Sequence, residues 1–236
     1  MKKTALGIFI GLIILALSGT VVLGQPSSRN NKIQTPEIER GVFVDYGYNS
    51  PPWYPPTEET DTYRWAPSIY WANLPVAINV YTGDEPISGT FGAIEAGFTA
   101  WDDETETSLY GSITEETGSW PGVGLDNENT AAWGTIDGPG GIIGVTYYWY
   151  YVATKEMVEF DIVMDSEEPW STTEEEDTFD VQNIATHEAG HTLVLQDLRS
   201  PKDGALTMHA YTWLEDITKR TLGSGDILGV RAIYGE

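Results

Sequence analysis

The chain contains three histidines, all between residues 187 and 209. Two of them, His187 and His191, lie four residues apart in the string His-Glu-Ala-Gly-His. On a helix this spacing places both rings on one face, where they can bind a single Zn²⁺. Glu188 follows the first histidine and is placed to polarise a zinc-bound water. The spacing predicts a hydrolytic zinc site; the alternative is a pair of helix-surface histidines without a metal.

A catalytic zinc takes three protein ligands and keeps one position open for water. The chain has no Cys, which excludes thiolate ligands and disulfides, so the third ligand must be a carboxylate or a histidine. Asp197, six residues after His191, is the first choice, because the chain can turn back toward the metal after the helix. His209 is the rival ligand, and the alternative for Asp197 is a solvated side chain.

Apolar residues at helical spacing predict three helices that would position this site. The first contains Phe91, Ile94, Phe98 and Trp101, the second runs from Phe179 to about Leu195 and carries the histidines, and the third starts at Ser224 or Asp226. The expected N-caps are Ser88 or Thr90 for the first helix and Asp177 or Thr178 for the second.

Alternating or β-branched runs predict strands at residues 75–81, 141–152 and 157–164. In the last run Val158, Phe160 and Ile162 alternate with Glu159, Asp161 and Val163. Residues 103–140 suggest loops around one or two strands, and residues 198–223 suggest irregular structure. The tyrosine-rich stretch 147–151 is interpreted as a packed strand, with a carbohydrate platform as the alternative. Mixed strands and helices without βαβ repetition indicate an α+β fold or an irregular α/β sandwich.

The N-terminal part of the chain suggests export. Residues 4–24 form an uncharged apolar run after Lys2 and Lys3, as in a signal peptide or a retained membrane anchor. Residues 25–61 are expected to be a Pro-rich linker or short pro-segment, with a stiff, extended stretch at 51–56. Residues 62–236 are expected to form the folded domain.

The net charge of −24 argues against nucleic-acid binding through a basic patch. The acidity is compatible with a structural Ca²⁺, although no loop of EF-hand form occurs, so a calcium site would be irregular. We expect a secreted or cell-surface monomer whose membrane contact, if residues 4–24 are not cleaved, is limited to that run.

The segment from His187 to Asp197 resembles the metzincin zinc-binding motif, H-E-x-x-H-x-x-G-x-x-H/D. Residues 206–211, Leu-Thr-Met-His-Ala-Tyr, resemble the metzincin Met-turn, which implies that Met208 lies under the metal without ligating it. Residues 141–150 are similar to the edge strand of the matrixin-type members. The resemblance implies a twisted mixed β-sheet, an active-site helix, and a small C-terminal subdomain with the Met-turn and a final helix.

The resemblance also implies a zinc endopeptidase that hydrolyses protein or peptide substrates, with Glu188 as the general base. The strand at 141–150 would pair with an extended substrate. Tyr211 is a further candidate, as a donor to the oxyanion, and an ordinary turn or core tyrosine is its alternative. A non-catalytic extracellular binding protein on the same scaffold is the alternative function.

Three departures from the family pattern have physical consequences. Val194 stands where the family usually has a Gly that adopts positive φ, so this turn must be strained or built differently. No His precedes residue 187, which removes the ligands of a second, structural zinc site. Without Cys there is no cysteine switch, and latency is left to residues 25–61, for example through Asp45.

Overall fold

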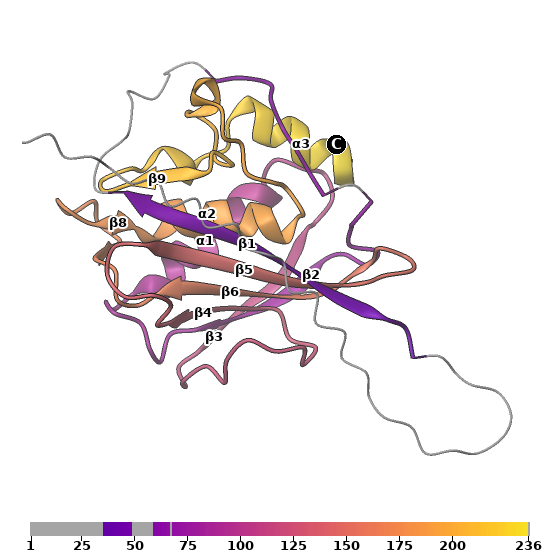
Figure 1. Ribbon diagram of the computed structural model, residues 1–236, viewed down its shortest axis with the longest axis horizontal. Helices are drawn as coiled ribbons and strands as arrows, with labels where there is room; N and C mark the ends of the chain where they lie inside the picture. The colour runs from indigo at the N-terminus through magenta and orange to yellow at the C-terminus, as the bar shows by residue number, and fades with distance from the viewer. Residues whose placement is uncertain (1–34, 49–58, 67, 236) are drawn as a thin grey trace, which may run out of the picture. The chain divides into compact units, whose positions relative to one another are not determined.

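A seven-stranded mixed sheet, in the order β3-β2-β4-β6-β5-β1-β9, forms the centre of the fold (Figure 1). Its strands are β1 (Ile38–Tyr48), β2 (Val76–Tyr81), β3 (Tyr110–Glu116), β4 (Thr130–Gly134), β5 (Ile142–Tyr151), β6 (Met157–Asp165) and β9 (Tyr211–Trp213). Strands β2, β3, β4 and β6 are parallel, and β5 is antiparallel to β6. A separate pair, β7 (Trp170–Ser171) and β8 (Phe179–Asp180), precedes the histidine helix.

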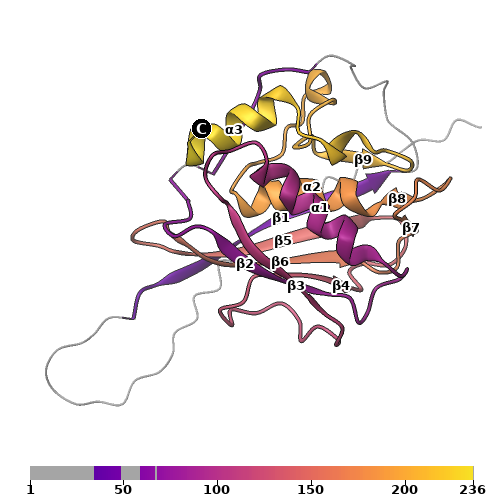
Figure 2. The ribbon, with the colours of Figure 1, turned by 180° about the vertical axis from the view of Figure 1, so that it is seen from behind.

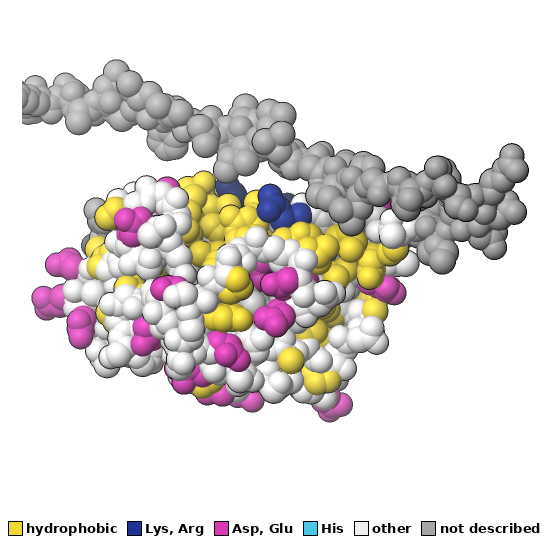
Figure 3. Space-filling view, turned by 90° about the horizontal axis from the view of Figure 1, so that it is seen from below, with side chains coloured by type: hydrophobic (Ala, Val, Ile, Leu, Met, Phe, Trp, Pro, Cys, Tyr) yellow, Lys and Arg dark blue, Asp and Glu magenta, His cyan; other side chains and the backbone are white. Residues whose placement is uncertain are grey.

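The computed structural model describes residues 35–48, 59–66 and 68–235. The predicted signal or anchor at 1–24 and the Pro-rich stretch at 51–56 lie outside these residues. None of the helices within them is both long and apolar enough to span a bilayer. On the face shown in Figure 3, acidic side chains are scattered widely and basic ones are few.

Two helices, α1 (Thr90–Asp102) and α2 (Val181–Thr192), lie on one face of the sheet (Figure 2). The helices approach closely at Gly97, where any side chain would collide with the backbone of Ala185. The indole of Trp101, fully buried, donates to the carbonyl of Thr186 at 2.7 Å. Helix α1 therefore holds α2 against the sheet. The remaining helical elements are α3 (Ser224–Tyr234) and two 3₁₀ turns, η1 (Pro201–Asp203) and η2 (Thr218–Arg220).

The predicted fold class, the three helices and the strands predicted at 75–81, 141–152 and 157–164 are confirmed, but the predicted N-caps are wrong. Helix α1 is preceded by Gly89 in the left-handed region, at φ 87°. Helix α2 is capped by Asp180, whose side chain accepts from the amide of Asn183 at 2.8 Å. Because β8 pairs with β7 up to Asp180, the helix begins later than the sequence pattern indicates.

The prediction that residues 141–150 form an edge strand is also wrong. Strand β5 lies inside the sheet, because β1 pairs with it antiparallel from Ile38 opposite Tyr151 to Tyr46 opposite Ile142. Neither β1 nor the three-residue β9 was predicted from the sequence. Strand β1 therefore occupies the side of β5 that was expected to be open.

Strand β6 differs from the half-exposed strand that its alternation suggests, because Glu159 and Asp161 are buried. The segment around residues 124–127 covers them: the amides of Asp126 and Asn127 donate to Glu159, and that of Gly124 donates to Asp161 at 3.0 Å. Burial raises the pKa of Glu159 to about 7 and that of Asp161 to about 6. Both carboxyls thus bind protons more tightly in the folded chain than in the unfolded one.

Replacing Glu159 by Gln is expected to change how stability depends on pH. The folded pKa of about 7 exceeds the ordinary 4.5, so stability falls as pH rises between these values. The neutral amide removes that loss. Relative to wild type, the free energy of unfolding of Glu159→Gln should therefore be higher at pH 8 than at pH 5 by on the order of 1 kcal/mol. Urea unfolding at both pH values measures this, with the exposed Glu95→Gln as control; an equal difference at both pH values would refute it.

Candidate metal centre

Helix α2 places His187 and His191 on one buried face. Both rings are fully buried, and each is oriented by a backbone carbonyl that contacts its Nδ1. The partner of His187 is the carbonyl of Thr207 at 2.7 Å, and that of His191 is the carbonyl of Leu195 at 2.8 Å. A carbonyl can only accept, so Nδ1 carries the proton and Nε2 presents its lone pair.

A left-handed residue ends helix α2 and reverses the chain. Val194 adopts φ 64°, and the amide of Leu195 donates to the carbonyl of Gly190 at 3.1 Å. Residues 64–66 contact this turn and stabilise it, since the amide of Ala66 donates to the carbonyl of Val194 at 2.9 Å. The turn for which the metzincin resemblance implies Gly is therefore made here with a β-branched residue, in the strained conformation that the sequence indicated.

This strain predicts an unusual order of stabilities at Val194. Both Val194→Gly and Val194→Ala remove buried methyl groups, but only Gly relieves the left-handed strain. The Gly variant should be more stable than the Ala variant by roughly 0.5–1 kcal/mol, measured by urea unfolding. At Ala189, inside the right-handed helix, Ala189→Gly should instead destabilise. If Ala is the more stable residue at 194, the turn carries no strain.

After the turn at Val194, the chain brings the side chain of Asp197 close to His187 and His191. Its Oδ1 lies 3.5 Å from Nε2 of His187 and 3.5 Å from Nε2 of His191. Although burial alone would raise the pKa of Asp197, the two histidines lower it well below its usual value, so the carboxylate is ionised. The structure thus brings together the three residues that the sequence predicted as ligands, all within one group of potential metal-binding atoms.

The donor atoms of this group fit a zinc ion. Nε2 of His187, Nε2 of His191 and Oδ1 of Asp197 are all buried and have no hydrogen-bond partner. Buried polar atoms are seldom left in this state unless a cation or water binds them. Donors about 2.0–2.1 Å from a tetrahedral zinc lie about 3.3–3.4 Å apart, close to the observed separations. Within the described part of the chain His209 does not join this group.

Glu188 lies beside the three donor atoms, against strand β5. Its Oε2 accepts from the hydroxyl of Thr146, and its Oε1 is buried next to Gly144, where any side chain would collide with it. Burial raises the pKa of Glu188 to about 7; the neighbouring His191 opposes this rise, and the charge of Asp45 adds to it. The carboxyl is thus held rigidly beside the site and can exchange a proton near neutral pH.

Met208 packs against helix α2, which carries the two histidines. Its side chain is buried, and a side chain at Gly190 of α2 would collide with its sulfur. The turn that carries it is closed by the amide of His209, which donates to the carbonyl of Leu206 at 3.1 Å. Asp226 of α3 accepts from the amides of Thr207 and Met208, at 2.7 and 3.1 Å. A tight turn at residues 206–209 therefore places Met208 against α2.

His209 and Tyr211, which the sequence singled out, lie near Lys219, which it did not suggest. The ring of Tyr211 packs against that of His209, with centroids 5.4 Å apart. Burial, together with the nearby charge of Lys219, lowers the pKa of His209 to about 4. The Lys219 ammonium is buried and donates to the carbonyl of His209 at 2.6 Å and to the hydroxyl of Thr212 at 2.7 Å. No spacing pattern in the sequence links Lys219 or Thr146 to the histidine motif.

Comparison with known proteins agrees with this geometry. The family model described as matrixin matches residues 64–235. Human Stromelysin-3 is 33% identical over 101 residues, which cover 43% of this chain and 18% of that protein. Residues 64–235, which the family model matches, contain the histidine helix, the donor atoms, the Met208 turn and α3. Because the family model spans most of the sequence and every one of these features, the chain belongs to the matrixin family.

Proposed function

We propose that this protein is an exported, zinc-dependent endopeptidase. The observation that carries the proposal is the convergence of three buried donor atoms without partners, with the carboxyl of Glu188 beside them. His187, His191 and Asp197 would hold the metal, and Met208 would support it from below. Family membership supports zinc peptidase chemistry, while the roles of the individual residues belong to the proposal.

When bound, zinc would supply Lewis acidity toward the scissile carbonyl and toward the attacking water. The Glu188 carboxylate takes a proton from that water and returns it to the leaving amine. The hydroxyl of Thr146 positions Glu188 through its hydrogen bond to Oε2. Tyr211 is the proposed donor to the developing oxyanion.

The substrate in this proposal is a protein or peptide, which membership of a peptidase family supports. Export rests on the apolar run at residues 4–24 after Lys2 and Lys3. The charge of −24 supports a protein substrate over a nucleic acid.

Metal removal tests the proposal. The chain without residues 1–24 is expected to bind one zinc, measured by atomic emission, and to cleave casein. Treatment with 1,10-phenanthroline should lower cleavage by about 10²-fold or more, and added zinc should restore it. Cleavage that persists in chelator, or a chain that binds no zinc, would overturn the proposal.

A further inference from the structure

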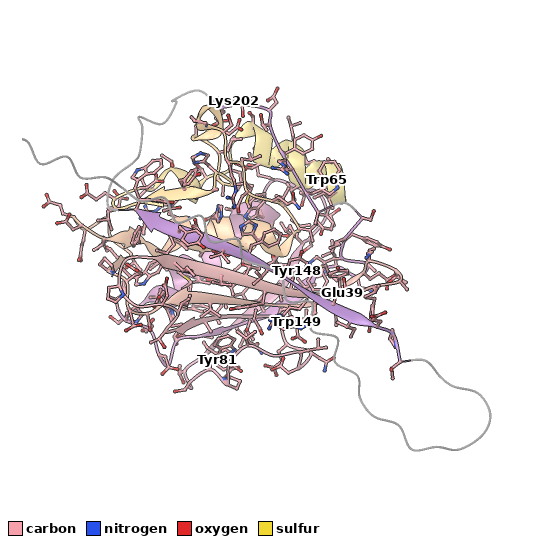
Figure 4. All side chains as sticks on the ribbon, in the orientation of Figure 1. Glu39, Trp65, Tyr81, Tyr148, Trp149 and Lys202 are labelled. Atoms are coloured by element: carbon pink, nitrogen blue, oxygen red, sulfur yellow. The ribbon has the colours of Figure 1, made fainter. Side chains whose placement is uncertain are left out.

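Lys219, in the 3₁₀ turn η2, has its side chain buried beside the metal centre. Only 2% of the residue is exposed, and its ammonium lies 3.4 Å from Nδ1 of His187. One imidazole ring therefore separates this ammonium from Nε2 of His187, the candidate metal ligand. Lysine is almost never fully buried unless its charge is paired. Lys202, in η1, shows the usual arrangement, since it is exposed and lies at the outer edge of the molecule in Figure 4.

Polar contacts fix the backbone of η2 against helix α2. The amide of Lys219 donates at 2.7 Å to Oδ1 of Asn183, which lies one turn before His187 on α2. Asp216 precedes η2, and its Oδ1 accepts from the amide and the hydroxyl of Thr218 at 3.0 and 2.7 Å. Both Asn183 and Asp216 are buried. The position of the ammonium is therefore set by α2 and by η2 itself.

The ammonium has more hydrogen-bond donors than there are acceptors around it. Of its three N–H groups, one donates to the carbonyl of His209 at 2.6 Å and one to the hydroxyl of Thr212 at 2.7 Å. The third faces Nδ1 of His187, which already carries a proton because it donates to the carbonyl of Thr207. In the described part of the chain Lys219 forms no ion pair. This part of the site is thus rich in donors and carries a positive charge.

Lys219 determines how the hydroxyl of Thr212 is oriented. An ammonium can only donate, so Oγ1 of Thr212 accepts from Lys219 and its own O–H must point elsewhere. That hydroxyl donates to Oδ2 of Asp45 at 3.3 Å. The pair therefore presents a donor, backed by a positive charge, at a point that a carboxylate oxygen occupies in this structure. A hydroxyl oriented in this way favours an acceptor, and it favours a charged acceptor most.

Three kinds of substrate side chain would meet this pair differently. An apolar side chain would leave the hydroxyl of Thr212 and the third N–H of Lys219 buried without acceptors, which is unfavourable. The carboxamide of Asn or Gln would supply an acceptor but no charge. The carboxylate of Asp or Glu supplies both, and hydrogen bonds to an ionised group are roughly twice as strong as neutral ones. The pair therefore discriminates in favour of an acidic side chain.

We propose that the Lys219–Thr212 pair makes this site select protein or peptide substrates with an acidic residue next to the bond that is cleaved. The proposal rests on the proposed function. The cleaved bond must lie at the candidate metal-binding atoms, and the ammonium lies only one imidazole ring away from them. The side chain that reaches the pair therefore belongs to a residue adjoining that bond. Its carboxylate accepts from the hydroxyl of Thr212 and lies near the ammonium, so both residues determine specificity.

Peptides that carry a hydroxamate test this selectivity without requiring cleavage, since the hydroxamate binds the metal and fixes the register. Two series have Glu, Gln or Leu next to the hydroxamate, on its N-terminal or on its C-terminal side. Binding of labelled peptides to the zinc-loaded chain without residues 1–24 is measured by fluorescence anisotropy. In one of the two series the Glu peptide should bind at least about tenfold more tightly than the Gln and Leu peptides. Internally quenched peptides with the same residues should show the same order in kcat/KM.

Side-chain variants test whether the pair causes the preference. Thr212→Val removes the donor with little change of shape and should reduce the preference for Glu over Gln to about twofold or less. Thr130→Val is the matched control, because it also removes a buried hydroxyl that donates to a carboxylate, that of Asp161, and it should keep the full preference. Lys219→Met should act like Thr212→Val, with Lys202→Met at an exposed lysine as its control.

The ratio of the two binding constants distinguishes this role from a structural one. A residue that only stabilises η2 would weaken the binding of all peptides alike and leave the ratio unchanged. If Lys219→Met does not fold, the comparison of Thr212→Val with Thr130→Val still decides the role of the pair.

The binding and cleavage measurements separate this proposal from the proposed function. Chelator-sensitive casein cleavage, with equal binding of the Glu and Gln peptides in both series, would overturn the selectivity and leave the peptidase intact. A Glu preference in binding that Thr212→Val removes, without casein cleavage by any form, would support the selectivity and count against the endopeptidase. A preference for Leu, a Glu preference that survives both variants, or failure of every peptide to bind would overturn the role of the pair.

Discussion

Replacing Glu188 by Gln is expected to lower kcat for casein cleavage by about 10²–10⁴-fold while zinc content stays at one per chain. The amide matches the carboxyl in shape and can still accept from the hydroxyl of Thr146, but it cannot take a proton from water. Because the donor atoms for zinc come from other residues, metal binding should not change. KM should change little, since the base acts in the transition state.

Glu95→Gln is the matched control, because it makes the same chemical change on the exposed face of helix α1. Activity of the Glu188 variant equal to that of wild type would show that another group, or a contaminating protease, removes the proton.

Asp197→Ala is expected to weaken zinc binding more than about 100-fold, beyond the loss caused by removing an outer-shell partner of a ligand. Its Oδ1 lies equally close to both histidines, so its removal leaves two neutral ligands and no compensating negative charge. The variant should therefore lose zinc to a chelating dye at concentrations that wild type withstands.

His209→Ala is the informative comparison, because His209 is the rival third ligand. Its ring packs against Tyr211, and its atoms do not belong to the donor group of the described residues. This variant should keep a zinc affinity close to that of wild type. The reverse pattern, with zinc lost in the His209 variant and kept in the Asp197 variant, would assign the third ligand to His209.

The candidate metal-binding residues could be predicted from the sequence because their geometry is local. Two histidines four apart on a helix share a face wherever the helix lies, and Asp197 needs only the turn at Val194. Thr146 and Asp226 could not be predicted in the same way. They reach the site from a strand and a helix far away in the sequence, and no spacing rule connects them with the motif.

Strong periodic signals likewise predicted the three helices and strands β2, β5 and β6, whereas elements with a weak periodic pattern were missed. Strand β9 has only three residues, too few to show alternation. Strand β1 was missed because its inward face mixes Phe43 with Gly and Asp residues, while Val42 and Tyr46 on the other face are exposed, so no clear apolar alternation results. Glu159 appeared solvent-facing because local alternation contains no information about the segment that covers it.

The carboxylate of Asp226 makes the C-terminal helix part of the scaffold of the site. It joins the first turn of α3, through the amide of Gly223 at 3.0 Å, to the amide of Thr207. The carbonyl of Thr207 in turn fixes the ring of His187. Fraying of α3 would free this carbonyl and let the imidazole rotate. Metal release and melting of the last eleven-residue helix should therefore occur as one event on heating, although α3 contributes no ligand.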